Sequence, residues 1–538
     1  MLRTLFLITT MLLTLVAKAG AQAPSLEDII ADFAGAKKFS QVEAVIERLA
    51  TTGDPRAALA LRSLSDGTLM ARTTDGRVLV VEGEAPNLVL RDAVSGEALK
   101  DGPVEASGLK KIKIKNSLRR KIAAALSGLT LKAKSADVRR TAARTIFEQS
   151  DASALEALDE ALQTETDANV RSAFIEARAS ALLATDAPLA EKSEAIDIIA
   201  ARGDRAALAL LSAYANAADG ELKTKLDAGI AKVEESLAAW SAAQNIWYGI
   251  SLGSVLLLAA IGLAITFGVM GVINMAHGEM VMLGAYTTFA VQEVFRTTAP
   301  GLFDYSLLVA VPLAFLVSGT IGVIMERGLI RFLYGRPLET LLATWGVSLI
   351  LQQSVRTLFG PTNREVGNPS WMSGAFEIGQ MSITWNRLWI VVFAAVVFAA
   401  LYLIINRSAL GLEMRAVTQN RRMAGAMGIK TSWVDAMTFG LGSGIAGIAG
   451  VALSQIDNVS PNLGQSYIID SFLVVVFGGV GNLWGTLVGA MTLGIANKFL
   501  EPYTGAVLGK ILVLVLIILF IQKRPRGLFA LKGRAVET

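Results

Sequence analysis

The feature that most constrains the fold is a stretch from residue 246 to residue 523 that consists mostly of Leu, Val, Ile, Ala, Gly and Phe. Short polar segments divide it into apolar runs of about the length that a helix needs to cross a bilayer, roughly 20 residues. Backbone groups within a bilayer need partners inside the protein, so such runs predict helices. The predicted spans are residues 247–270, 272–294, 306–326, 338–358, 388–406, 434–454, 467–480, 485–500 and 506–522. We therefore expect a polytopic α-helical membrane domain over residues 245–525.

The preceding residues, 24–240, are rich in Ala, Asp, Glu, Lys and Arg. Apolar residues recur there at helical spacing, which predicts a soluble, mostly helical domain. Residues 54–61 (DPRAALAL) resemble residues 204–210 (DRAALAL), a pattern typical of helical repeats of the HEAT type. An irregular helical bundle is the alternative. The expected fold class is therefore mainly α throughout the chain.

Residues 68–115 interrupt the helical pattern of this first half. Asp75 and Gly76 lie between two alternating runs and predict a hairpin, and residues 93–97 indicate a second turn. Residues 110–115 (KKIKIK) predict an edge strand with a solvated face. We expect a small β insertion in the helical domain.

Residues 1–23 have the features of a secretory signal peptide. Arg3 gives a basic start, residues 5–16 form a short apolar core, and Ala at positions 19, 21 and 23 fits the A-x-A pattern of a cleavage site. An uncleaved membrane anchor is the alternative. Either one places residues 24–240 outside the cytoplasm, in the periplasm.

Loop charges orient the membrane domain, because cytoplasmic loops are enriched in Lys and Arg. Basic residues gather in residues 327–336, in residues 407–430 and in the tail, whose last part we assign to residues 526–538. All three are expected to be cytoplasmic. With these loops placed, the chain is outside the cytoplasm after residue 454, so a cytoplasmic tail requires an odd number of further membrane crossings. The short runs at 467–480 and 485–500 supply two of these crossings. These two are expected to form either a broken pair that lines a pathway or a plain tight hairpin.

Composition excludes several kinds of site. The chain has no Cys and one His, which rules out disulfides and thiolate chemistry and argues against a histidine-based metal site. The net charge of +4 does not indicate a nucleic-acid partner, because much of the basic excess lies in membrane loops and the tail. No phosphate-binding loop is present, since residues 505–511 (GAVLGKI) have the wrong spacing. We expect no catalytic residues, no metal and no cofactor, and therefore a protein that is not an enzyme.

Two polar groups inside the membrane domain are candidates for a solute pathway. Asn274 and His277 are three residues apart and Glu279 follows, and polar groups at membrane depth mark pathways by default. The alternative is that they tie helices together or cap a helix near the cytoplasmic surface. The second group is the turn between the two short runs, with Gly478, Gly479, Gly481 and Asn482.

The longest cytoplasmic polar segment, residues 407–430, is a candidate docking surface. Leu412, Ala416, Met423 and Met427 could form an apolar stripe on a short helix lying along the membrane face. Arg415, Arg421 and Arg422 are candidate electrostatic contacts, with simple retention of loop orientation as the alternative.

Three ordered motifs resemble the branched-chain amino acid and urea permeases of ATP-binding-cassette (ABC) transporters. They are residues 272–279 (VINMAHGE) with 282–286 (MLGAY), residues 411–420 (GLEMRAVTQN) with 426–429 (AMGI), and residues 477–489 (FGGVGNLWGTLVG). The signal peptide and the long soluble extension are similar to those of the urea-type subunit. The resemblance covers about residues 245–530.

The resemblance implies a multi-pass channel-forming subunit of the bacterial inner membrane, surrounded by lipid, that moves urea or a similar small polar solute. It also implies partners: cytoplasmic ATP-binding subunits, a second related permease and a periplasmic solute-binding protein. The second motif would contact the ATP-binding subunit, through residues Leu412, Arg415, Asn420, Arg421, Arg422, Gly425 and Gly428. The motions would follow an alternating-access scheme, and residues 24–240 would dock the solute-binding protein or support the complex.

Three other functions stay open. A branched-chain amino acid permease would share the membrane half, and an ATP-independent channel or secondary transporter would need no ATP-binding partner. A receptor with an extracytoplasmic sensor would need a cytoplasmic output domain, and only a short tail follows Ile521.

Overall fold

The computed structural model describes residues 25–52, 54, 56–83, 88–99 and 108–529. The chain divides into two compact units, Met1–Leu237 and Ala238–Thr538. The predicted signal peptide, and residues 530–538 of the predicted tail, lie outside the described residues.

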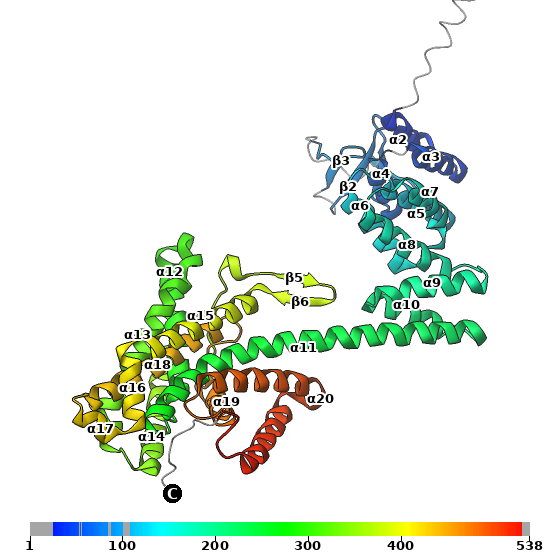
Figure 1. Ribbon diagram of the computed structural model, residues 1–538. Helices are drawn as coiled ribbons and strands as arrows, with labels where there is room; N and C mark the ends of the chain where they lie inside the picture. Colours follow the sequence, from blue (N-terminus) through cyan, green and yellow to red (C-terminus); the bar gives the residue numbers. More distant parts are fainter. Residues whose placement is uncertain (1–24, 53, 55, 84–87, 100–107, 530–538) are drawn as a thin grey trace, which may run out of the picture. The chain divides into compact units, whose positions relative to one another are not determined.

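The first unit is mainly helical, as expected (Figure 1). Its helices are α2 (Leu26–Gly35), α3 (Phe39–Thr51), α4 (Ala57–Asp66), α5 (Asn116–Leu131), α6 (Ala136–Gln149), η2 (Ala152–Ala154), α7 (Leu155–Thr164), α8 (Ala168–Leu183), α9 (Leu189–Arg202) and α10 (Arg205–Ala215). Asp side chains cap the starts of η2, α8 and α10. Asp167 Oδ1 accepts a hydrogen bond of 2.9 Å from the Asn169 amide before α8, and Asp204 Oδ1 accepts one of 2.8 Å from the Ala207 amide before α10. The HEAT-type assignment stays a prediction.

The predicted β insertion is a four-stranded antiparallel sheet in the order β3-β2-β1-β4. Its strands are β1 (Leu69–Arg72), β2 (Val78–Glu82), β3 (Val89–Asp92) and β4 (Leu109–Lys111). The turn at Asp75 and Gly76 is confirmed, since β1 pairs with β2 across it and Gly76 has a φ of 71°. The lysine-rich edge strand is also present, but it ends at Lys111 rather than residue 115. Lysines on an edge strand discourage pairing with another chain.

The second unit contains the long apolar helices and one small hairpin that the sequence did not predict. The elements are α11 (Gly220–Met270, which begins in the first unit), α12 (His277–Thr298), η3 (Pro300–Tyr305), α13 (Ser306–Gly328), η4 (Ile330–Phe332), α14 (Pro337–Phe359), η5 (Ser370–Met372), β5 (Ala375–Ile378), β6 (Met381–Thr384), α15 (Trp385–Arg407), α16 (Ala409–Gln419), α17 (Arg421–Ala426), α18 (Thr431–Ser454), α19 (Leu463–Gly478) and α20 (Leu483–Lys523).

Five of the described helical stretches are long and apolar enough to cross a membrane. They are α11, the stretch Pro300–Phe332 that contains α13, and helices α15, α18 and α20. Helices α12 and α14 have 22 and 23 residues but more polar sequences, and α19 has 16 residues. The predicted set of nine crossings therefore stays a prediction.

One predicted boundary was wrong, and another coincides with a bend in a helix. Helix α12 begins at His277 rather than at residue 272, because Gly271, with a φ of 68°, ends α11 and the next residues are not helical. The runs 485–500 and 506–522 lie on either side of a bend in α20 at Gly505 (φ 77°, ψ 163°), three residues after Pro502, in agreement with the predicted break between them. Apolar composition marks both halves of such a helix but does not show how a bend joins them.

Helix α18 is the buried centre of the second unit. Its glycines let neighbouring backbones approach closely. A Cβ atom at Gly442 would lie 2.6 Å from the carbonyl oxygen of Gly262 in α11, and one at Gly447 would lie 2.5 Å from that of Ala314 in α13. Small residues at contacts are the usual means by which helices associate in a bilayer, where burial of apolar groups gives no advantage over lipid.

Candidate functional site

The first candidate pathway group lies where the chain turns back after α11. Residues 271–276 are not helical. Asn274 Oδ1 accepts a hydrogen bond of 3.0 Å from the Ala276 amide, which fixes the turn before α12. His277 then begins α12, and its Nε2 lies 2.9 Å from the carbonyl oxygen of Ala259 in α11. A carbonyl oxygen only accepts, so Nε2 carries the proton in this contact.

Glu279 connects α12 to α14 through side chains. Its Oε1 accepts hydrogen bonds from Ser348 Oγ at 2.9 Å and from Gln352 Nε2 at 2.8 Å. Asn274, His277 and Glu279 are each 1% exposed. We call these three residues the buried polar cluster.

The buried polar cluster contacts the middles of its neighbouring helices. Ala259 is near the centre of the apolar 247–270 run, and Ser348 lies midway along α14. Ser318, near the middle of α13, donates to the Met280 carbonyl oxygen over 3.0 Å. These contacts fit the alternative that the polar residues tie helices together, so a role in a solute pathway stays a prediction.

Each residue of the buried polar cluster keeps one atom without a hydrogen-bond partner. These atoms are Asn274 Nδ2, His277 Nδ1 and Glu279 Oε2, and all three are buried. Nδ2 is a donor, Oε2 of an ionised carboxylate is an acceptor, and Nδ1 is an acceptor when Nε2 carries the proton. Buried polar atoms without partners are uncommon and call for an explanation. A solute group that reached any one of these atoms would satisfy that atom.

A polar stripe on α14 was missed in the sequence. Thr340, Thr344, Ser348 and Gln352 recur at intervals of four residues and are all buried. Thr344 Oγ1 accepts a hydrogen bond of 3.1 Å from the Met275 amide, so the stripe holds the 271–276 turn as well as Glu279. The spacing of four inside a predicted span was the available signal, since it puts all four side chains on one helix face.

The second candidate pathway group forms the turn between α19 and α20. Gly479 and Gly481 have φ of 106° and 78°, and Asn482 Oδ1 accepts from the Gly485 amide over 3.1 Å to cap α20. The carbonyl oxygen of Gly478 accepts a hydrogen bond of 3.1 Å from the Phe529 amide, which joins the turn to the chain that follows α20. This is a tight turn fixed by the backbone.

The structure places His277 away from the second group. A Cβ atom at Gly268 would lie 2.6 Å from the Cα atom of Gly481, whereas His277 contacts Ala259. Those positions on α11 are about 13 Å apart along the helix axis at 1.5 Å per residue. The pathway role of either group stays a prediction.

The 407–430 segment folds into two short helices, α16 and α17, rather than one. Leu412, Met423 and Met427 of the predicted apolar stripe are 62%, 59% and 77% exposed, whereas Ala416 is partly buried. The segment therefore does present apolar side chains on its surface.

The other predicted contact residues of this segment have different environments. Asn420 Oδ1 accepts a hydrogen bond of 2.9 Å from the Met423 amide and caps α17. Arg415 donates to the Ile405 carbonyl oxygen near the end of α15, and Arg421 forms an ion pair with Asp435. Arg422 is exposed, as are Gly425 and Gly428, and Gly428 has a φ of 90°.

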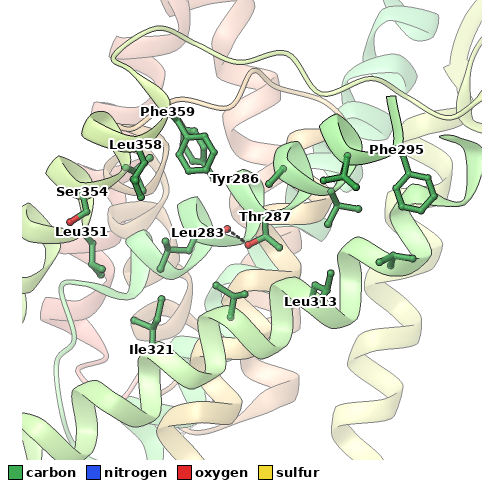
Figure 2. Close-up of a pocket in the computed structure, with 16 residues that line it drawn as sticks. Leu283, Tyr286, Thr287, Phe295, Leu313, Ile321, Leu351, Ser354, Leu358 and Phe359 are labelled. Atoms are coloured by element: carbon green, nitrogen blue, oxygen red, sulfur yellow. Dashed lines mark hydrogen bonds between the residues drawn. The ribbon is translucent and has the colours of Figure 1, made fainter. Parts of the chain in front are cut away.

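An apolar groove of about 650 Å³ lies between α12, α13 and α14 (Figure 2). Thr287 and Ser354 line it, but their hydroxyls donate to the carbonyl oxygens of Leu283 and Ile350 on their own helices, each over 2.7 Å. Most of the remaining lining is aliphatic or aromatic, as Leu313, Leu358 and others in Figure 2 show. The groove suits an apolar surface and not a polar solute.

Comparisons with known proteins cover the second unit. The family model described as branched-chain amino acid transport system, permease component, matches residues 245–521. The high-affinity branched-chain amino acid transport system permease protein LivH of Salmonella typhimurium is 32% identical over 296 residues, 53% of this chain and 94% of that protein. BraD of Pseudomonas aeruginosa, which has the same description, is 30% identical over 292 residues, again 53% of this chain and 94% of that protein.

A more distant relative is the ribose import permease protein RbsC of Escherichia coli, 26% identical over 211 residues, 37% of this chain and 62% of that protein. No solved structure matches the chain. The family match begins at residue 245, at the boundary where the composition changes and close to the start of the second unit. With this match and the relatives above, the chain belongs to the family of permease components of branched-chain amino acid transport systems.

Proposed function

We propose that this chain is the membrane-spanning permease subunit of an ABC importer that moves urea, or a similar small polar solute, across the inner membrane. ATP hydrolysis would take place on separate cytoplasmic subunits, because the sequence contains no phosphate-binding loop. A second related permease and a periplasmic solute-binding protein would complete the transporter, and the first unit would lie in the periplasm.

The observation that carries this proposal is the set of unpartnered atoms in the buried polar cluster. The carbonyl oxygen of urea can accept from Asn274 Nδ2, and a urea N–H group can donate to Glu279 Oε2 or to His277 Nδ1. Among the described residues, no Lys or Arg side chain donates a hydrogen bond to these three residues. A neutral solute with donors and acceptors on a small frame fits such a set.

The long first unit supports the urea-type assignment. The alignments to the branched-chain relatives include 94% of those proteins but only 53% of this chain, so the relatives have no counterpart of the first unit within the aligned length. Their names favour a second candidate, a branched-chain amino acid. That solute carries a carboxylate and an ammonium group, for which helix N-termini and Glu279 would be the available partners.

Uptake by the complete transporter tests the proposal and separates the two solutes. Proteoliposomes containing all subunits would be supplied with ATP inside and with labelled urea or labelled leucine outside together with the solute-binding protein. We expect ATP-dependent accumulation of urea. Accumulation of leucine alone would make the amino acid the solute, and accumulation of either without ATP would exclude an ABC importer.

Two serines on α14 give a matched pair of variants. Ser348→Ala removes a donor to Glu279, whereas Ser354→Ala removes a hydroxyl that bonds only its own helix. We expect Ser348→Ala to lower uptake about tenfold, the effect of one lost hydrogen bond to a charged group. The Ser354→Ala variant should transport normally. Equal effects of the two variants would show that the buried polar cluster is not part of the solute pathway.

A further inference from the structure

Arg421 reaches from α17 to helix α18, although 43% of its side chain is exposed. Its Nη1 donates to Asp435 Oδ1 over 3.2 Å, and its Nη2 makes a second, shorter contact with Oδ2. The Asp435 side chain in α18 is 0% exposed, and Arg421 is its hydrogen-bond donor among the described residues. A two-pronged pair of this kind fixes orientation as well as distance.

The same guanidinium group reaches a third element. It lies over the ring of Tyr334, 4.8 Å from the centroid, in the connection between η4 and α14. The Tyr334 hydroxyl donates to Glu326 Oε1 over 2.9 Å, and Glu326 is a buried residue in the last turns of α13. One side chain of α17 is thus connected to α18 directly and to α13 through Tyr334.

Helices α13 and α18 pack too closely to slide past each other freely. A Cβ atom at Gly440 of α18 would lie 2.7 Å from a methyl group of Val323 in α13, and one at Gly319 would lie 3.1 Å from the Gly440 carbonyl oxygen. Interfaces packed this closely shift as units. Further along α13, Ser318 bonds the Met280 carbonyl oxygen beside Glu279. A displacement of Arg421 can therefore be passed through contacting residues of α18 and α13 to the buried polar cluster.

The same segment also exposes apolar side chains. Met423 and Met427, close to Arg421 in sequence, are 59% and 77% exposed. The segment thus carries both an exposed apolar surface and the arginine that pairs with Asp435.

We propose that Arg421 is a positioning residue that transmits movement of α16 and α17 to α18 and α13, and not a contact to the ATP-binding subunit. This proposal rests on the proposed function, which identifies the partner that moves the segment as the ATP-binding subunit. What it adds is the connection from Arg421 to Asp435 and, through Tyr334, to Glu326. Without the link, the partner would still bind and hydrolyse ATP, but the membrane helices would not follow.

The test compares solute moved per ATP hydrolysed in proteoliposomes of the complete transporter. The variants are Arg421→Gln, Asp435→Asn and the double variant, with Arg407→Gln as the control because Arg407 is an exposed cation of the same segment. We expect each single variant to lower the ratio about tenfold, within the range of coupling between residues in contact. The double variant should be no worse than the single ones, and the amount of bound ATP-binding subunit should be unchanged.

Any of the following ratios would overturn the proposal: a normal ratio in Arg421→Gln, an equal loss in Arg407→Gln, or a double variant in which the single losses multiply. Loss of the ATP-binding subunit from Arg421→Gln would also count against it, since that is the behaviour of a docking contact. If that variant does not fold, Arg421→Lys, which keeps the charge but not the two-pronged bond, is judged by the same ratio. Failure of the proposed function itself would appear in the unmodified transporter, as absence of ATP-dependent uptake.

Discussion

Glu279 combines two favourable contacts for a carboxylate that is removed from water. It stands in the first turn of α12, where the helix dipole favours an anion, and its Oε1 accepts two hydrogen bonds from α14. A carboxylate at this depth is expensive unless its partners are in place. Ser348 and Gln352 therefore hold α12 and α14 together at Glu279. A solute that formed a hydrogen bond with Oε2 of Glu279 would affect the same contact between the two helices.

A second carboxylate, Glu165 in the first unit, gives a pH prediction at the residue scale. The hydrogen bond from the Arg139 guanidinium at 2.6 Å lowers the pKa of Glu165 below its ordinary value of 4.5, against the opposing effect of burial. A lowered folded-state pKa means that the pair stabilises the fold above pH 4.5 and that this stability is lost as the pH falls through the folded-state value. We expect a contribution on the order of 1 kcal/mol.

Hydrogen exchange of α6 and α8 at pH 7 and pH 4, corrected for intrinsic rates, measures this effect. Protection should fall with pH in the unmodified protein and should depend less on pH in Glu165→Gln. Glu148→Gln is the control, because Glu148 pairs with Arg144 on an exposed helix face where ion pairs contribute little. The same pH dependence in Glu165→Gln would show that another group is responsible.

At the scale of single helices, the glycines of the membrane unit decide how closely its helices approach. A Cβ atom at Gly284 of α12 would overlap the Gly447 carbonyl group of α18, whereas one at Gly346 of α14 would meet nothing within 4 Å. We expect Gly284→Ala to destabilise the folded unit by about 1–3 kcal/mol through overpacking. Gly346→Ala should be tolerated or slightly stabilising, since alanine favours a helix more than glycine does.

Thermal unfolding of the two variants in the same detergent tests that difference. A clearly lower midpoint for Gly284→Ala than for Gly346→Ala is the expected result. Equal midpoints would mean that α12 and α18 can separate by the width of a methyl group at no cost, against the close packing described above.

At the scale of the whole molecule, the predicted orientation can be tested with single cysteines, because the chain has none of its own. Met427 in the 407–430 segment is 77% exposed, and Tyr503 near the bend of α20 is 85% exposed. The loop charges place Met427 in the cytoplasm, and the crossing count places Tyr503 outside. In intact spheroplasts, a membrane-impermeant thiol reagent should label Tyr503→Cys and should reach Met427→Cys only after permeabilisation. Labelling of both positions from one side would refute the crossing count.

The sequence alone determined the two-part organisation of the chain, the helical class of both parts and the small sheet, because these depend on local patterns. Long apolar runs predict helices whatever they pack against, and the turn at Asp75 and Gly76 needs only its own backbone. The family could also be named from the motif residues, and the family match agrees. The α14 stripe was present as a spacing of four residues but was overlooked.

Only the tertiary structure decided where the polar groups lie. Residue order puts His277 seven positions after the end of α11, and the chain has to turn back at Gly271 before His277 can meet Ala259. Arg421 and Arg422 are exposed neighbours with equal charge, yet it is Arg421 that pairs with Asp435 of α18. Such contacts depend on the direction in which each helix returns and on the side chains it then faces. Local sequence does not encode that direction, whereas the close glycine contacts between α11, α12, α13 and α18 fix it.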